Sequence, residues 1–147
     1  MTLLLSSTDA RRALERSNTV VVLGAHPDLA RPAGYVTAYL AQVGYAVTAV
    51  NPAAAGQALA SLTIGDTLRG LGDVDLLVIF RRAEALPGHL DDILTMRPLP
   101  TTVWLQLGIR NDAFALALSQ AGIDVVQDRC TLADHRAFGL PKRPQAA

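Results

Sequence analysis

The chain has 147 residues, half of them apolar and few of them aromatic, which is enough for one domain with a full hydrophobic core. Thirteen basic residues balance thirteen acidic ones, so the charge favours neither nucleic acid nor an anionic membrane as a partner. A single cysteine, Cys130, excludes an intramolecular disulfide and a cysteine-based zinc site. Because no apolar run suits a membrane span or a signal peptide, we expect a cytoplasmic protein with one domain over residues 1–147.

Helical and extended patterns alternate along the chain. In order, they predict a helix at 6–17 capped near Ser7 or Thr8, a strand at 19–24, a helix at 32–43, a strand at 45–50, a short strand near 57–60, a helical turn near 65–70, a strand at 75–80, a helix at 83–96, a strand at 101–106, a helix at 111–121, a strand at 123–127 and a helix at 131–138.

The longer strands are continuous apolar runs, which is typical of strands buried on both faces. Short apolar strands alternating with amphipathic helices predict a three-layer α/β/α fold with a doubly wound, Rossmann-like parallel sheet. In such sheets, ligands bind beyond the carboxyl ends of the strands.

Arginines follow several of the predicted strands. Lys142 is the only lysine, and five of the arginines lie in the segments after predicted strands: Arg31, Arg81, Arg82, Arg110 and Arg129. Parallel strands end at one edge of a sheet, so we expect these side chains to gather where a ligand binds. Because arginine makes planar, bidentate contacts with phosphate and carboxylate, the pattern predicts a polyanionic ligand.

Gly24 lies between the first strand and the following helix, where free N–H groups favour phosphate. The loop matches neither G-x-G-x-x-G nor the P-loop pattern. Asn51 ends the second strand in place of the acidic residue that binds a nicotinamide ribose. The residues therefore predict a phosphate-bearing nucleotide other than NAD or ATP.

Four blocks carry a family resemblance: VVLGAHPDLARPAGYVTAYLAQVGYAVTAVNP, DLLVIFRRAEALP, VWLQLGIRND and AGIDVVQDRC followed by DH. In order and spacing, from about residue 18 to 136, they resemble the small CoA-binding proteins of bacteria. Those are stand-alone Rossmann domains similar to the CoA-binding domain of the succinyl-CoA synthetase alpha subunit. The resemblance implies that coenzyme A or an acyl-CoA is the ligand.

The resemblance also implies which residues face the ligand. By motif position they are Gly24, Ala25, His26, Arg31, Pro32, Tyr35, Asn51, Pro52, Phe80, Arg81, Gln106, Leu107 and Gly108. The chain departs from the family pattern at His26, where a small hydroxyl residue is usual. It departs again in the alanine-rich segment 53–62, where relatives carry polar or charged residues.

Two classes of function stay open. One is a non-catalytic carrier, sensor or subunit that binds CoA, with its oligomeric state and any protein partner undefined. The other is an enzyme component, part of an acyl-CoA ligase or transferase or of a nucleotide-dependent oxidoreductase. The missing acidic residue after the second strand and the lack of a general acid/base pair favour binding. We predict no catalytic residue and no metal ligand.

The remaining polar and aromatic candidates each have two interpretations. His26 either contacts phosphate or is a solvated loop residue, and His89 is expected to be solvated. Cys130 and His135 could form a nucleophilic dyad, or Cys130 a mixed disulfide with CoA, but a packing role is expected for both. Trp104 is expected in the core rather than as a stacking platform.

Overall fold

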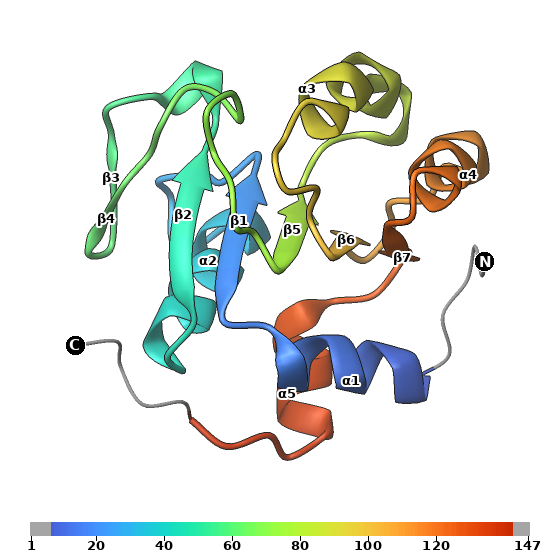
Figure 1. Ribbon diagram of the computed structural model, residues 1–147. Helices are drawn as coiled ribbons and strands as arrows, with labels where there is room; N and C mark the ends of the chain where they lie inside the picture. Colours follow the sequence, from blue (N-terminus) through green and yellow to red (C-terminus); the bar gives the residue numbers. More distant parts are fainter. Residues whose placement is uncertain (1–6, 143–147) are drawn as a thin grey trace.

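The computed structural model describes residues 7–142 and contains a five-stranded, fully parallel sheet between two helical layers (Figure 1). The strand order is β2 (Ala46–Val50), β1 (Thr19–Leu23), β5 (Leu76–Ile79), β6 (Thr102–Leu105) and β7 (Asp124–Val126). The order changes direction beside β1, which creates a switch point at its carboxyl end. The predicted Rossmann-like α/β class is confirmed.

Each face of the sheet is covered by its own set of helices, because side chains alternate along a strand. Val20 and Val22 of β1 pack with α1 (Ser7–Arg16), α2 (Pro32–Gln42) and α5 (Thr131–Ala137). On the opposite face, Val21 and Leu23 pack with the 3-10 helix η2 (Ala83–His89), α3 (Leu90–Leu94) and α4 (Asp112–Gln120). Trp104 is fully buried in the first of these cores, as predicted.

The connection from β2 to β5 contains no α-helix within the part of the chain that the structure describes. It begins with a 3-10 turn, η1 (Pro52–Ala54), and a two-stranded hairpin, β3 (Ala58–Leu59) and β4 (Leu62–Thr63). The predicted strand near 57–60 is therefore one arm of this hairpin. Of the helical turn predicted near 65–70, the structure has only a single turn at its end, in which the N–H of Leu71 donates to the carbonyl oxygen of Leu68 at 3.2 Å. Gly65, at its start, pairs instead with Val50 in a parallel bridge.

The predicted helix at 83–96 is wrong in detail. It is divided into η2 and the short α3, and Pro87 lies inside η2. Proline has no N–H group and its ring clashes with the preceding turn of an α-helix, so an α-helix through Pro87 is disfavoured. The expected cap side chains at Ser7 and Thr8 lie outside what the structure describes, as does residue 6 of that predicted helix. Within residues 7–142, no helix is both long and apolar enough to cross a membrane.

Candidate functional site

A cavity of about 980 Å³ lies along the carboxyl edge of the sheet and receives residues that follow all five parallel strands. Every predicted ligand-facing residue lines it except Ala25, which is fully buried beneath the loop, and Pro52, which is exposed at the start of η1. Those that line it are Gly24, His26, Arg31, Pro32, Tyr35, Asn51, Phe80, Arg81, Gln106, Leu107 and Gly108.

The cavity also contains residues that the site prediction omitted: Ala33, Val36, Arg82, Ala83, Glu84, Ile109 and Cys130. Most of them lie one or two positions from a predicted residue in the same loop. Val36 lies one helical turn after Pro32, so the spacing of α2 was a usable signal for it. For Ala33, Arg82, Ala83 and Ile109, extending each strand-end motif by two residues would have been sufficient. Glu84 lies three residues beyond Arg81, and the loop that carries Cys130 holds no predicted site residue.

The turn between β1 and α2 depends on two glycines. Gly24 has φ +91, and a Cβ atom built there would lie 2.2 Å from the carbonyl oxygen of Phe80. A Cβ atom on Gly34, in the first turn of α2, would lie 2.1 Å from the carbonyl oxygen of Asp28. Only glycine therefore allows β1 to run against β5 and the 26–31 loop to fold against the helix.

Among the α-helices that the structure describes, α2 is the one whose first turn carries no acidic residue. Its cap residue, Arg31, makes no side-chain capping bond, and the first turn holds no acidic residue. The other α-helices that the structure describes each carry an aspartate in the first turn. A helix N-terminus carries a partial positive charge, so this one is suited to an anionic ligand.

His26 is fixed in the loop by a hydrogen bond. The backbone N–H of Asp28 donates to Nδ1 of His26 at 2.9 Å. Nδ1 is therefore the acceptor, and in the neutral ring Nε2 carries the proton. Since His26 also lines the cavity, its second nitrogen is a potential donor to phosphate.

Only part of the predicted arginine cluster reaches the cavity. Arg31, Arg81 and Arg82 line it. Arg110 instead forms an ion pair with Asp112 at 3.2 Å, and Arg129 makes a bidentate pair with Asp134 at 2.6 and 3.0 Å. The prediction that all five arginines form the rim is therefore wrong, because aspartates at the starts of α4 and α5 bind two of them.

Arg81 is the most enclosed of the three lining arginines. Its Nε atom is buried, and within residues 7–142 it has no hydrogen-bond partner. Arg31, by contrast, is 66% exposed and lies 3.8 Å from Asp28, while Arg82 is 86% exposed and lies 3.6 Å from Glu84. Arg81 therefore has an unsatisfied donor at the wall of the cavity.

His89 lies near Arg81 and is half-buried, so its side chain is less solvated than predicted. Burial lowers the pKa of His89 below its ordinary value of 6.5, and the positive charge of Arg81 lowers the pKa further. Asp92 has the opposite, smaller effect. The imidazole therefore prefers its neutral form in the folded protein.

Asn51 lines the cavity, but its side chain is used within the protein. Its Nδ2 donates to the carbonyl oxygen of Ala25 at 2.9 Å, and its Oδ1 accepts from the N–H of Ala53 at 3.0 Å. These bonds join the end of β2 to the loop after β1. A carboxylate has no N–H group to donate to the carbonyl oxygen of Ala25. The acidic residue that binds the ribose of a nicotinamide nucleotide in other Rossmann domains therefore does not suit this position.

Cys130 and His135 are directed to different surroundings. Cys130 is half-buried and lines the cavity, whereas His135 is buried and shares a 2.7 Å hydrogen bond with the hydroxyl of Tyr39 through Nδ1. The geometry favours a packing role for His135 over the dyad. Within residues 7–142, no three His, Cys, Asp or Glu side chains are grouped so as to hold a metal ion.

A parallel sheet with a glycine turn after β1 and a cavity along its carboxyl edge defines a Rossmann-like, ligand-binding α/β domain. Within that class, the chain belongs to the family described as the CoA binding domain, which matches residues 18–136. The match covers every strand of the sheet and every loop that lines the cavity.

Individual relatives agree with this assignment. A solved structure from Thermus thermophilus is 42% identical, covers 91% of this chain and 99% of its own, and superimposes with a TM-score of 0.83. The uncharacterized protein YneT of Bacillus subtilis is 28% identical over 131 residues, which are 88% of this chain and 94% of YneT. A hypothetical protein from Pyrococcus horikoshii is 22% identical, covers 90% of this chain and 92% of its own, and shares the fold with a TM-score of 0.74.

Proposed function

We propose that this protein binds coenzyme A or an acyl-CoA in the carboxyl-edge cavity as a non-catalytic carrier, sensor or subunit. The observation that carries the proposal is the uncapped start of α2 beside Arg31 and Arg81 in a cavity of about 980 Å³. A helix N-terminus and arginine side chains both stabilise phosphate oxygens. The family assignment supports CoA as the phosphate-bearing ligand.

In this proposal, the phosphates of CoA contact the first turn of α2, the Nε2 atom of His26 and the guanidinium group of Arg81. Gly24 and Gly34 allow the turn between β1 and α2 to take the conformation that places the first two of these groups at the cavity. Tyr35 is 44% exposed at the cavity and offers an aromatic face to the adenine. The cytoplasm remains the predicted compartment, and any protein partner or oligomeric state is left open.

Thermal unfolding with CoA, NAD and ATP at equal concentrations tests the proposal. A ligand that binds only the folded protein stabilises it by about 2.7 kcal/mol when present at roughly 100 times its Kd. We expect CoA to raise the Tm more than NAD or ATP. A larger shift with NAD would point to the oxidoreductase alternative, and no shift with CoA would refute the proposal.

A further inference from the structure

The two halves of the cavity differ in charge. The strand order places the ends of β2 and β1 in one half and those of β6 and β7 in the other, with β5 between them. The cationic lining residues Arg31 and Arg81 follow β1 and β5. Arg82 lies beside Arg81 and pairs at 3.6 Å with Glu84, which is the acidic residue of the lining. The lining residues that follow β6 and β7 are all uncharged: Gln106, Leu107, Gly108, Ile109 and Cys130.

The two arginines that follow β6 and β7 do not contribute positive charge to the lining of the uncharged half. Arg110 and Arg129 follow β6 and β7, but Asp112 and Asp134 pair with them, and neither arginine lines the cavity. A negative charge lies against the turn after β6, because the Oδ1 of Asp128, in the loop after β7, accepts from the N–H of Gly108 at 2.6 Å. A ligand carboxylate in this half would lack a cation among residues 7–142 and would meet a like charge.

Leu107 lies at this half of the cavity, in a turn over residues 106–109 that hydrogen bonds stabilise. The N–H of Ile109 donates to the carbonyl oxygen of Gln106 at 2.9 Å, and Gly108 has φ +85. The N–H of Asp128 donates to the carbonyl oxygen of Ile109 at 3.1 Å, so Asp128 bonds the turn at two points. Leu107 is 71% exposed at the tip of this turn. A fixed, exposed leucine in a cavity gains free energy when an apolar ligand group covers it.

The reach of CoA connects the two halves. Neighbouring strands lie about 4.8 Å apart, so the ends of β1 and β7 are separated by roughly 14 Å across three steps. The arm from the pyrophosphate to the thiol is a chain of about a dozen bonds and spans roughly 15 Å when extended. With the phosphates at the start of α2, the thiol end therefore reaches the turn that carries Leu107.

From this arrangement we infer that the ligand is a CoA thioester of an uncharged, apolar acyl group, and that Leu107 determines this specificity. The inference rests on the proposed binding of CoA and adds the class of acyl group to it. Acyl groups that end in a carboxylate are disfavoured, because the lining after β6 and β7 has no cation to pair with that carboxylate.

Calorimetric titration of the full chain under reducing conditions tests the inference, with CoA, butyryl-CoA and succinyl-CoA as ligands. Partial burial of the butyryl methylenes against Leu107 should make butyryl-CoA bind about fivefold tighter than CoA. Succinyl-CoA should bind about tenfold or more weaker than butyryl-CoA. In Leu107→Ala, the affinities of butyryl-CoA and CoA should become nearly equal.

Two further variants make the test specific. Leu107→Arg supplies the missing cation and should reverse the preference in favour of succinyl-CoA. Leu116→Ala, an exposed leucine on α4 that does not line the cavity, should leave all three affinities unchanged. If CoA binds but butyryl-CoA and succinyl-CoA bind equally well, the acyl specificity is wrong and CoA binding stands. If none of the three binds, both proposals are wrong.

Discussion

The side chain of Gln106 joins the end of β6 to the start of α5 through Thr131. Its Nε2 donates to Oγ1 of Thr131 at 2.7 Å, and its Oε1 accepts from the N–H of Thr131 at 3.3 Å. Both residues are almost fully buried. Although Gln106 was predicted to face the ligand and does line the cavity, its amide positions the two loops that form the uncharged half.

We expect Gln106→Ala to destabilise the protein by about 1–3 kcal/mol, because it leaves the buried hydroxyl oxygen of Thr131 without its donor and the N–H of Thr131 without its acceptor. Urea unfolding measures the change. Gln120→Ala is the matched control, since Gln120 is exposed at the end of α4. Equal losses in the two variants would show that the bond to Thr131 contributes nothing specific.

Arg81→Met should weaken CoA binding by about tenfold, because Arg81 has a buried, unsatisfied donor at the cavity and methionine retains only the apolar stem. Arg31→Ala should weaken CoA binding less, since Arg31 is exposed and forms an ion pair with Asp28. Titration calorimetry gives both affinities.

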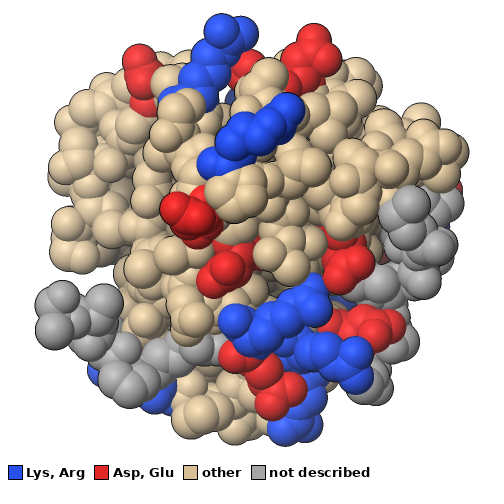
Figure 2. All heavy atoms as spheres, viewed as in Figure 1, with Lys and Arg blue, Asp and Glu red and all other residues tan. Residues whose placement is uncertain are grey.

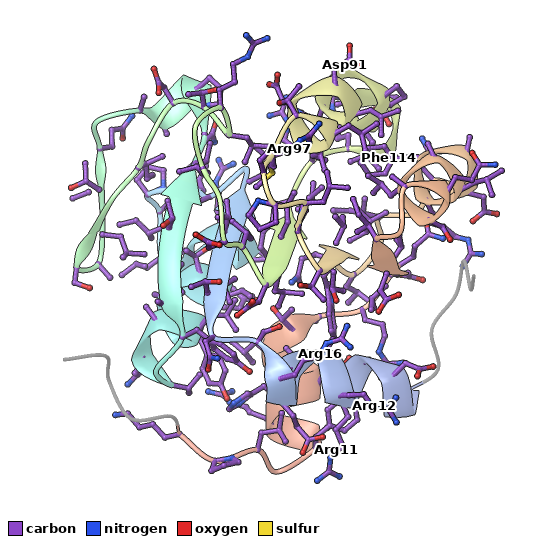
Figure 3. All side chains as sticks on the ribbon, in the orientation of Figure 1. Arg11, Arg12, Arg16, Asp91, Arg97 and Phe114 are labelled. Carbon is purple, nitrogen blue, oxygen red and sulfur yellow. The ribbon has the colours of Figure 1, made fainter. Side chains whose placement is uncertain are left out.

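Arg12→Ala is the control for these two variants. Arg12 lies on α1, at the end of the molecule opposite the carboxyl ends of β1 and β2 (Figure 3). Figure 2 shows basic and acidic side chains interleaved over this helix, so it forms no continuous cationic surface. A loss in Arg12→Ala as large as in Arg81→Met would indicate a diffuse charge effect and no defined phosphate site.

Gly34→Ala should impair both folding and binding. The added Cβ would lie 2.1 Å from the carbonyl oxygen of Asp28 and 2.9 Å from that of His26, so the loop must move away from α2. Such overpacking typically costs about 1–3 kcal/mol. Gly88→Ala is the control, because its Cβ would meet nothing within 4 Å. Similar Tm and CoA affinity in the two variants would contradict the close packing described for this turn.

His89 should make the folded protein less stable in mild acid. Its pKa is lowered in the folded state, so the unfolded chain binds the proton more readily below the ordinary pKa of 6.5. The stabilisation from neutral His89 is present above that pH and is lost as the pH falls through it.

The comparison of wild type with His89→Gln isolates this effect. Between about pH 7.5 and pH 5.5, the Tm of the wild type should fall further than that of the variant. Arg81→Met should also reduce the fall, because the charge of Arg81 contributes to the lowered pKa. Parallel curves for wild type and His89→Gln would show that the protonation of His89 is not linked to folding.

The parts of the fold that the sequence predicted well are those governed by local pattern. The run at 19–24 is continuously apolar because β1 is buried on both faces, and Asn111 does cap α4 by accepting from the N–H of Phe114. The division of the 83–96 helix was foreseeable from Pro87. Of the hairpin of β3 and β4, only the arm near 57–60 was predicted, because strands of two residues carry little pattern.

The candidate site was predicted in position but not in its charges. Parallel topology alone brings the ends of all five strands to one cavity, so loop residues could be placed without a structure. An arginine can bind a ligand only if no acidic side chain of the protein already pairs with it. Pairs such as Arg129 with Asp134 depend on the position of the start of α5, which the sequence pattern does not give. The burial of His89 likewise depends on how η2 packs, and the sequence pattern carries no signal for it.

Amide chemical-shift mapping by NMR tests directly whether CoA occupies the carboxyl-edge cavity. On addition of CoA, we expect the largest shifts at residues 24–35, 80–84 and 106–109, with residues 9–16 of α1 unchanged. Shifts concentrated on α1, or no saturable shifts at all, would contradict this expectation.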